Sequence, residues 1–329
     1  MIKKFKTFVT SEKSDGTFFN SIQEKTINEL PKGDLLINVK YSSLNFKDAL
    51  SATGNKGVTK KYPHIPGIDA VGIIKESQDS KFPINSSVIV SGYDLGMNTS
   101  GGFSEYIRVP SSWAVLKPET LSLEDSMIIG TAGLTAGLCV RAIQKEHSIR
   151  GMNAIVSGAT GGVGCIAVKL LSKLGAKVTA ITGKPKSHSF LQNLGAQKIL
   201  DRSEFLNSVK GPIGKGLWDI AIDIVGGSML STILASMKYG GITTCCGLVE
   251  SPIFKSSVFP FILRANQLVG IDSAEAPLNI KKEIWHNFSK KWKLNNLEQI
   301  SNIVNLNEIS LEIKKILTGG QTGRVVLKL

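Results

Sequence analysis

The feature that most constrains this chain is an apolar segment that runs into a glycine-rich turn and then directly into a helix-like stretch. Residues 154–171 read Ala-Ile-Val-Ser-Gly-Ala-Thr-Gly-Gly-Val-Gly-Cys-Ile-Ala-Val-Lys-Leu-Leu. A strand, a glycine turn and a helix in this order form the setting in which a backbone binds the pyrophosphate of a dinucleotide. We predict that Gly158 and Gly161 allow a sharp turn and the approach of the phosphates. Gly164 would allow the helix to pack closely on the strand.

The start of this helix would supply the remaining phosphate contacts. The first N–H groups of a helix have no partner within it, so those at Gly162 and Val163 would meet the phosphate charge. Glycine turns also join strands to helices where nothing binds, and a purely structural turn is the alternative. The strand before the turn, the helix after it and a second strand at residues 177–182 favour a dinucleotide site.

The end of the second strand discriminates between the two nicotinamide cofactors. An NAD site usually carries Asp or Glu about 20 residues beyond the glycines, where it binds the ribose 2′-hydroxyl. Residues 178–188 read Val-Thr-Ala-Ile-Thr-Gly-Lys-Pro-Lys-Ser-His, with no carboxylate. Because lysines and hydroxyls suit a 2′-phosphate, the sequence predicts NADPH, with contacts from Thr182, Gly183, Lys184, Lys186, Ser187 and His188. Ordinary solvated lysines are the alternative, since lysine is abundant along this chain.

The pattern of elements divides the chain into domains. Up to about residue 122, short β-like runs are separated by Pro and Gly, which indicates a compact, mostly β domain. Beyond it, apolar strands alternate with amphipathic helices as in the βαβ units of a parallel sheet. We therefore expect an α/β protein with a doubly wound parallel sheet. Its parts would be a first domain of residues 1–122, a dinucleotide-binding domain of residues 123–273, and a tail of residues 274–329 that returns to the first domain.

The net charge of the chain limits the kinds of partner that it can bind. The formal net charge is +13 over 329 residues, which would suit nucleic acid, an acidic surface or a phosphorylated small molecule. The lysines are scattered in pairs and are not gathered in an aromatic-interleaved block. Most are therefore interpreted as a solvated face, with a minority serving an anionic ligand. We expect a small-molecule partner and no nucleic acid.

Neither a membrane span nor a metal site is expected. No apolar stretch follows the N-terminal lysines, which argues against a secretory signal and for a cytoplasmic protein. The longest weakly polar run, residues 128–140, is too short to cross a bilayer. The cysteines lack metal-ligand spacing and are interpreted as buried free thiols; they are Cys139, Cys165, Cys245 and Cys246.

Several longer strings resemble a known family. A mostly β first domain, a central glycine turn and a returning tail are similar to the medium-chain dehydrogenase/reductase superfamily. The strings that narrow the resemblance are Ser-Ser-Leu-Asn-Phe-Lys-Asp-Ala-Leu at 42–50, Ile-Pro-Gly-Ile-Asp at 65–69, Met-Ile-Ile-Gly-Thr-Ala-Gly at 127–133, Tyr-Gly-Gly at 239–241, Cys-Gly-Leu at 246–248 and Pro-Phe-Ile-Leu-Arg at 260–264. Over nearly the whole chain they resemble the zinc-free YhdH/YhfP-type quinone oxidoreductases, a group that includes NADPH-dependent acrylyl-CoA reductases.

The resemblance implies a GroES-like catalytic domain, a Rossmann domain and chemistry without zinc. Zinc-dependent alcohol dehydrogenases of this superfamily carry a Gly-His-Glu string, whose His is a metal ligand, and a four-cysteine lobe. This chain has Gly-Ile-Asp at 67–69 and no such lobe. The zinc route of alcohol oxidation is therefore not expected. A homodimer formed through an edge strand around residues 268–271 is expected from the family.

The activity that the resemblance implies is the reduction of the C=C bond of acrylyl-CoA, a short 2-enoyl-CoA thioester, to propanoyl-CoA. A hydride from NADPH would add to the β-carbon, and the α-carbon would then be protonated. The candidates that face the nicotinamide and the thioester carbonyl are Asn45, Lys47 and Asp48. The alternative is that Asn45 and Asp48 only cap the following helix.

The family's cofactor contacts carry over by position. They fall at Phe46, Gly164, Cys165, Ile166, Ala167, Lys186, Ser187, His188, Arg202, Leu248, Ile262, Ser273 and Arg324. Phe46 departs from the common pattern, because many relatives have Tyr there and its hydroxyl is missing here. Two other functions stay open: an NADPH-quinone oxidoreductase, and a basic nucleic-acid-binding or structural protein with a vestigial cofactor site.

Overall fold

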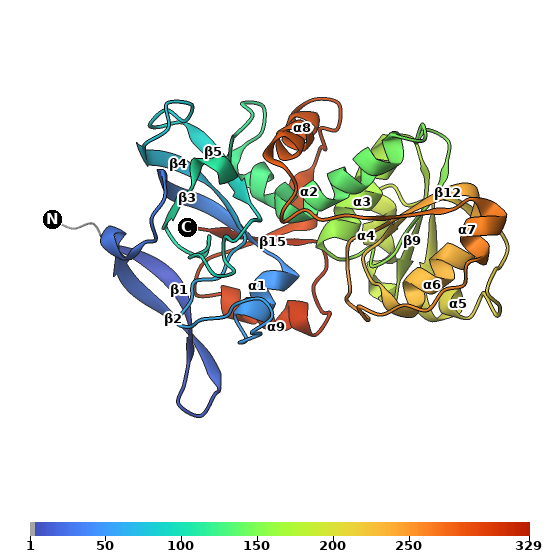
Figure 1. Ribbon diagram of the computed structural model, residues 1–329, viewed down its shortest axis with the longest axis horizontal. Helices are drawn as coiled ribbons and strands as arrows, with labels where there is room; N and C mark the ends of the chain where they lie inside the picture. The colour runs from blue at the N-terminus through green and yellow to red at the C-terminus, as the bar shows by residue number, and fades with distance from the viewer. Residues whose placement is uncertain (1–3) are drawn as a thin grey trace. The chain divides into compact units, whose positions relative to one another are not determined.

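The computed structural model describes residues 4–329; the first three residues of the predicted first domain lie outside the described residues. The chain forms two compact units, one that runs up to Thr131 and resumes at Ser273–Leu329, and one of Ala132–Asp272. Figure 1 lets the reader follow the chain by colour from β1 through the helices and strands of the second unit and back to α8, α9 and β15. The C-terminal tail thus belongs to the same unit as the N-terminal strands.

The first unit is mostly β, as predicted. β1 (Lys4–Glu12) and β2 (Phe18–Thr26) form an antiparallel hairpin. The other strands form one sheet in the order β14-β15-β3-β4-β5-β7, with β6 also paired to β3. Their bounds are β3 Leu35–Leu44, β4 Asp69–Ser77, β5 Ser87–Ser91, β6 Tyr106–Val109, β7 Ala114–Leu116, β14 Ser301–Val304 and β15 Arg324–Lys328. The helices of this unit are α1 Phe46–Ser51, α8 Leu278–Ser289 and α9 Ile309–Leu317.

Two long-range features of this sheet place the candidate catalytic loop. β3 buries Leu35, Ile37 and Val39 in the core with side chains of β4 and β5, which is the two-residue period of a strand. β15, from the end of the chain, pairs antiparallel with the last residues of β3 (Figure 1). The loop that leaves β3 therefore starts beside a strand that lies some 280 residues later in the chain.

The second unit is a six-stranded parallel sheet in the order β10-β9-β8-β11-β12-β13. Numbered from β8, this order is 3-2-1-4-5-6, the doubly wound order of dinucleotide-binding domains, so the predicted fold class is confirmed. The strands are β8 Asn153–Val156, β9 Lys177–Thr182, β10 Lys198–Asp201, β11 Trp218–Asp223, β12 Met237–Cys245 and β13 Gln267–Gly270. The helices are α3 Gly162–Lys173, α4 His188–Asn193, α5 Arg202–Leu206, α6 Gly227–Ala235 and α7 Phe259–Arg264.

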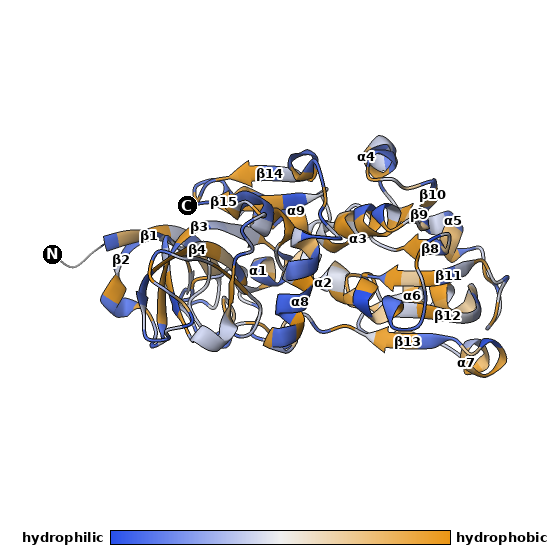
Figure 2. Cartoon of the chain, turned by 90° about the horizontal axis from the view of Figure 1, so that it is seen from above, coloured by the Kyte–Doolittle hydropathy of each residue, from blue (hydrophilic) through white to orange (hydrophobic). Residues whose placement is uncertain are grey.

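Burial explains why these segments form strands. Figure 2 shows the strands of this sheet one after another from β9 to β13, with β8 and β11 mainly in the hydrophobic colour. Ala154, Ile155 and Val156 of β8 are fully buried, because a central parallel strand is covered on both faces. The glycine turn follows this apolar run and therefore lies at the carboxyl edge of the sheet.

Helix α2 (Leu123–Gln144) connects the two units and bends at Gly130, whose φ is 47° and ψ is −157°. It contains the predicted apolar run of residues 128–140 and extends it at both ends, so its 22 residues are long and apolar enough to cross a membrane by length and composition only. However, 83% of its most apolar window is buried inside the protein. That burial is the property of a core helix.

Candidate functional site

The glycine turn has the geometry that the sequence predicts. Gly158 has φ 55°, a left-handed conformation that glycine adopts without strain. A Cβ added to Gly164 would lie 2.2 Å from the Gly158 carbonyl oxygen, so only glycine allows α3 to pack this closely on the turn. Gly161 differs, because an added Cβ would meet only the Gly158 oxygen, at 3.4 Å. The protein itself gives no steric reason for glycine at this position, whereas the approach of a ligand would.

The first turn of α3 offers unused N–H groups. Gly161 is the N-cap residue and has no side chain that could cap the helix, and the first intrahelical bond runs from the Cys165 N–H to the Gly161 carbonyl. Gly162 and Val163 are half-buried. This edge therefore fits the pyrophosphate of a dinucleotide. Three further predicted contacts turn inward, because the side chains of Cys165, Ile166 and Ala167 are fully buried in the core.

The loop after β9 gathers positive charge around Gly183. A Cβ added to Gly183 would lie 2.8–3.1 Å from the guanidinium of Arg202, so this guanidinium lies directly over the loop. The Lys184 N–H donates to the Thr182 hydroxyl at 3.0 Å, and burial lowers the pKa of the Lys184 ammonium. The structure thus brings together one set of predicted residues: Thr182, Gly183, Lys184, Lys186, Ser187, His188 and Arg202. Thr182 and Ser187 are buried, and the other five are half-buried or exposed.

A carboxylate does lie next to this loop, although the sequence between 178 and 188 has none. Asp201, the last residue of β10, is in register with Thr182 on β9. Its Oδ1 accepts hydrogen bonds from the N–H groups of Ser203 (2.7 Å) and Glu204 (3.2 Å), so it caps α5. The Ser203 hydroxyl also donates to Asp201 Oδ1. This bond, more than the two N–H bonds, lowers the pKa of the Asp201 carboxyl. Its position does not match that of the ribose-binding carboxylate of an NAD site, since it is committed to a helix end.

Asp223, at the end of β11, is a site residue that the sequence reading missed. It is fully buried, and its Oδ1 accepts from the Ser157 hydroxyl at 2.6 Å, while its Oδ2 accepts from the Gly226 N–H at 2.9 Å. The Ser157 oxygen in turn accepts from the Ile224 N–H at 2.9 Å. Burial raises the pKa of the Asp223 carboxyl, and these bonds oppose the rise. Asp223 thus ties the start of the glycine turn to the loop after β11.

The more distant predicted cofactor contacts do not all reach this edge. Leu248 is exposed and its Cα lies near Gly226, so it belongs to the same carboxyl edge as Asp223. Ile262 does not, because Arg264 of the same short helix donates to the Met237 carbonyl at the beginning of β12. That is the opposite end of the parallel strands. Ser273 is half-buried at the return to the first unit.

The loop after β3 forms a capping box. Asn45 is the N-cap of α1, and the Asp48 side chain accepts from the Asn45 N–H at 2.8 Å. Asp48 is fully buried, and its other oxygen accepts from the N–H groups of Gly67 (3.1 Å) and Ile68 (2.8 Å). Burial raises the pKa of Asp48 to about 7, although its backbone hydrogen bonds act in the opposite direction. In this geometry Asp48 joins the start of α1 to the backbone of Gly67 and Ile68.

Asn45 is also held from its other side by a buried polar network. Its amide Nδ2 donates to Asp69 Oδ2 at 2.9 Å, and Asp69 also accepts from the Ser43 hydroxyl at 2.6 Å and the Thr131 N–H at 2.8 Å. Gly130 is required beside this network, since an added Cβ would lie 2.8 Å from Asp69 Oδ2. The carboxylate therefore fixes both the Asn45 amide and the bend of α2.

Arg324, a predicted cofactor contact, belongs to the same network. Its side chain is 1% exposed and donates to the carbonyl of Ile128 at 2.9 Å, to Ser43 Oγ at 2.8 Å and to Asn45 Oδ1 at 3.4 Å. These acceptors hold the guanidinium beside Asn45. The physical reason is the pairing of β15 with β3, which buries Arg324 at the start of β15.

Two further residues of the loop keep part of their surface exposed. Phe46 and Lys47 begin α1 and are half-buried. Lys47 makes no ion pair with any carboxylate of residues 4–329. Ile68, at the position of the zinc-binding histidine in the resemblance, is a buried apolar side chain. Over the described part of the chain, no group of three or more His, Cys, Asp or Glu side chains could hold a metal ion.

Two protein-family models match the chain. The model described as alcohol dehydrogenase GroES-like domain matches residues 31–119, and the one described as zinc-binding dehydrogenase matches residues 162–289. The first match lies within the unit that carries Asn45 and Asp48, and the second begins at Gly162, the first residue of α3.

Relatives and solved structures match the chain from end to end. "Probable acrylyl-CoA reductase AcuI" of Escherichia coli (strain K12) is 38% identical over 96% of this chain and 98% of its own length. Acrylyl-CoA reductase AcuI of Ruegeria pomeroyi is 34% identical over 97% of both chains. The crystal structure of the YhdH oxidoreductase of Salmonella enterica in complex with NADP has a TM-score of 0.94 at 38% identity, over 98% of this chain and 99% of that one. The Bacillus subtilis YhfP structure with NAD bound has a TM-score of 0.96 at 36% identity, over 99% and 100%.

Proposed function

This chain belongs to the medium-chain dehydrogenase/reductase superfamily and, within it, to the family of AcuI, YhdH and YhfP, and on that premise we propose that it is an NADPH-dependent reductase of acrylyl-CoA and related short 2-enoyl-CoA thioesters. The product would be the saturated thioester, propanoyl-CoA. The observation that carries the proposal is the full-length similarity to two acrylyl-CoA reductases, which includes both units and leaves no large insertion or deletion.

The second unit supports the choice of cofactor. The uncapped start of α3 would hold the pyrophosphate, and Gly161 leaves room for its approach. Lys184, Lys186 and Arg202 would hold the 2′-phosphate, because two ammonium groups and a guanidinium around one loop favour a dianion. NADPH, when bound, supplies the hydride that adds to the β-carbon of the thioester.

The first unit would bind and polarise the substrate. We propose that Lys47 and the Asn45 amide donate hydrogen bonds to the thioester carbonyl, where negative charge develops as the double bond is reduced. Asp48 and Asp69 would keep these donors in place, since both carboxylates are buried and hydrogen-bonded to the loop. A fixed donor is worth more than a mobile one because it needs no reorganisation during the reaction.

A quinone is the second candidate substrate. YhfP, 38% identical over 94% of this chain, carries a quinone oxidoreductase name. The two functions separate in one experiment, in which NADPH oxidation is followed with acrylyl-CoA, with crotonyl-CoA and with 1,4-benzoquinone, and repeated with NADH. We expect the highest kcat/KM with acrylyl-CoA and NADPH. Faster turnover of the quinone, or a preference for NADH, would reject the proposal.

We further propose a cytoplasmic homodimer formed through β13, the edge strand of the parallel sheet. Residues 268 and 269 are half-buried, and the adjoining α7 exposes Ile262 and Leu263. An unpaired strand beside exposed apolar side chains is a surface that a second copy can cover. Sedimentation of the wild type against Leu268→Pro tests this. The Ile271 N–H donates to Cys245 of β12, so strand alternation directs the Leu268 N–H to the open edge, where proline removes it; a wild-type monomer would reject the proposal.

A further inference from the structure

The loop that follows α1 carries concentrated positive charge. From Ala49 to Ile68 the chain has three lysines, at positions 56, 60 and 61, and no Asp or Glu. In a protein that acts on a phosphorylated substrate, such a segment beside the candidate catalytic turn is a candidate for anion binding. The three lysines differ in their surroundings, and only two of them are open to a ligand.

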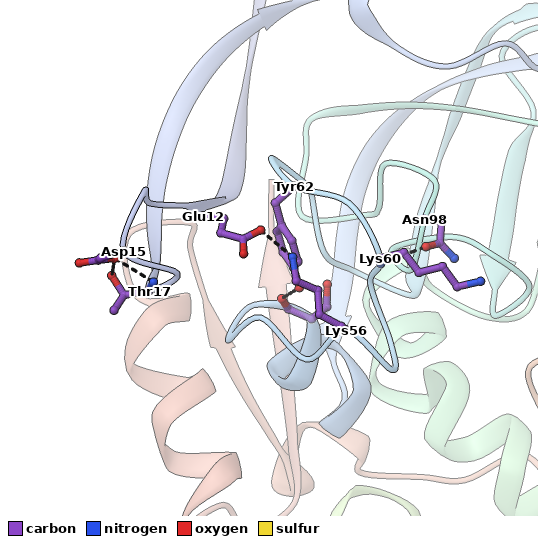
Figure 3. Close-up of polar contacts among 8 residues, drawn as sticks. Glu12, Asp15, Thr17, Lys56, Lys60, Tyr62 and Asn98 are labelled. Atoms are coloured by element: carbon purple, nitrogen blue, oxygen red, sulfur yellow. Dashed lines mark hydrogen bonds and ion pairs between the residues drawn. The ribbon is translucent and has the colours of Figure 1, made fainter.

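Lys56 is a structural residue. Its Nζ lies 2.6 Å from Glu12 Oε2 on the β1–β2 hairpin. The same ammonium lies 5.2 Å from the ring centroid of Phe18 and 4.8 Å from that of Tyr62, in cation–π contact with both. Figure 3 shows Lys56 between Glu12 and Tyr62. Its charge is therefore balanced within the protein, and it holds the loop on the hairpin.

The backbone that carries Lys60 and Lys61 is held on both sides. Thr59 is fully buried, and its hydroxyl lies 2.7 Å from the Ser51 hydroxyl in the last turn of α1. The Lys60 N–H donates to Asn98 Oδ1 at 3.2 Å, as drawn in Figure 3, and the Tyr62 hydroxyl donates to the Ser51 carbonyl at 2.7 Å. A ligand that binds these lysines would have little backbone left to order.

The side chains of Lys60 and Lys61 are exposed. In Figure 3 the Lys60 side chain extends away from Lys56 and Tyr62. Within residues 4–329 neither lysine forms an ion pair. Two adjacent, unbalanced ammonium groups on a rigid base attract a polyanion more strongly than single solvated lysines do, because each phosphate can interact with both.

Helix α1 sets the separation between these lysines and the proposed donors for the thioester. Its six residues rise about 9 Å, from the Asn45 cap to Ser51, which contacts Thr59. A ligand that spans both positions needs a long arm between its reactive carbonyl and its phosphates. In an acyl-CoA the pantetheine arm is longer than α1 and separates the thioester from the diphosphate and the 3′-phosphate.

We propose that Lys60 and Lys61 bind the phosphates of the CoA moiety and so make the enzyme select CoA thioesters over the same acyl group on a short thiol. This inference rests on the proposed function and adds to it the site that recognises the CoA moiety of the substrate. It also assigns a role to the β1–β2 hairpin, which braces the loop through Glu12 and Lys56.

The test compares two thioesters in two double variants. Lys60→Glu/Lys61→Glu is the test variant, and Lys290→Glu/Lys291→Glu, an exposed pair after α8 with the same change of charge, is the control. The substrates are acrylyl-CoA and acrylyl-N-acetylcysteamine, which carries the same acyl group without phosphates. In the test variant we expect the KM for acrylyl-CoA to rise about tenfold or more, with kcat and the KM for NADPH unchanged. Kinetics with the truncated thioester should stay within about twofold of wild type.

Calorimetric titration of free CoA into the wild type and the two double variants measures the contribution of the lysines to CoA binding independently of turnover. Weaker CoA binding only in the test variant supports the inference. Equal effects on both thioesters, an equal effect in the control variant, or a rise in the KM for NADPH instead would overturn it. If the wild type reduced no acrylyl-CoA at all, the proposed function would fail, and the CoA titration would still decide whether these lysines bind CoA.

Discussion

Alanine at Gly161 and at Gly164 should have opposite effects, which makes this pair a sharp test of the dinucleotide site. A Cβ at Gly164 would lie 2.2 Å from the Gly158 carbonyl oxygen and 2.7 Å from the Ala159 Cα. Both are backbone atoms, so the turn or α3 must move, and overpacking of this kind costs about 1–3 kcal/mol. At about 2–4 °C per kcal/mol for a domain of 150–250 residues, the melting temperature should fall by roughly 2–12 °C.

Gly161→Ala should leave stability almost unchanged. The added Cβ makes an ordinary contact of 3.4 Å, and the φ of −77° at this residue is one that alanine adopts. A surface change without strain stays within about 0.5 kcal/mol of wild type. The same methyl group stands where the pyrophosphate must approach the start of α3, so NADPH affinity should fall about tenfold or more through the loss of a charge-assisted contact.

Two measurements on each variant check this reasoning. Urea unfolding followed by tryptophan fluorescence gives the free energy of unfolding, and a fluorescence titration gives the Kd for NADPH. A Gly161→Ala protein that binds NADPH like the wild type would refute the close approach of the phosphates. A Gly164→Ala protein as stable as the wild type would refute the packing role of this glycine.

Three further changes test other parts of the structure. Replacing Lys184 and Lys186 by Glu should weaken NADPH binding at least about tenfold more than NADH binding, and equal weakening in a titration would contradict the 2′-phosphate site. Because the pKa of Asp48 is raised from 3.8 to about 7, the folded state binds more protons than the unfolded state between these values; stability should therefore fall as pH rises through this window, by at most about 1.4 kcal/mol per pH unit. Urea unfolding across that window should show this slope in the wild type and not in Asp48→Asn. Asp69→Ala removes the acceptor of the Ser43 hydroxyl and of the Asn45 amide, and unfolding should cost about 1–3 kcal/mol less for each donor left unpaired; an unchanged urea midpoint would show that the network is dispensable.

The parts of the fold that the sequence predicted are those encoded by local signals. The apolar run before Gly158, the glycines and the amphipathic stretch after them lie within one segment, so the strand, the turn and the helix could be located from periodicity alone. The loop after β9 could be found for the same reason, since it lies at a fixed distance from the turn.

Element ends and one whole hairpin were less predictable. β12 begins at Met237, only two residues after α6 ends at Ala235, so no loop signal separates the helix from the strand. Its pairing with β11 is irregular between Met237 and Ile242, where Gly240 has φ 71°, so the segment looked like a turn. The β1–β2 hairpin was missed because most β2 side chains are half-buried or exposed, which removes the apolar alternation that identifies a strand.

Long-range contacts lay beyond any local reading. Asp223 meets Ser157 across 66 residues, and Arg324 meets Ser43 across 281 residues. Neither pairing leaves a pattern in the sequence, because it arises from the order of strands in the sheets. The resemblance implied a cofactor contact for Arg324, but its burial beside Ser43 and Asn45 could not be foreseen from the sequence.

The two interpretations of the Asn45–Asp48 turn, helix capping and catalysis, are complementary in this structure. The capping box commits Asp48 to three backbone N–H groups and leaves it no contact with solvent. That commitment fixes where α1 begins and therefore where Phe46 and Lys47 stand. Because the capping box engages Asp48, and Asp69 already accepts from the Asn45 amide, we expect the Lys47 ammonium to be the stronger of the two proposed donors to the developing negative charge. Lys47→Met should therefore lower kcat, whereas Asp48→Asn should mainly lower the stability of the protein. If Asp48→Asn lowered kcat as much as Lys47→Met does and left the stability unchanged, this division of roles would be wrong.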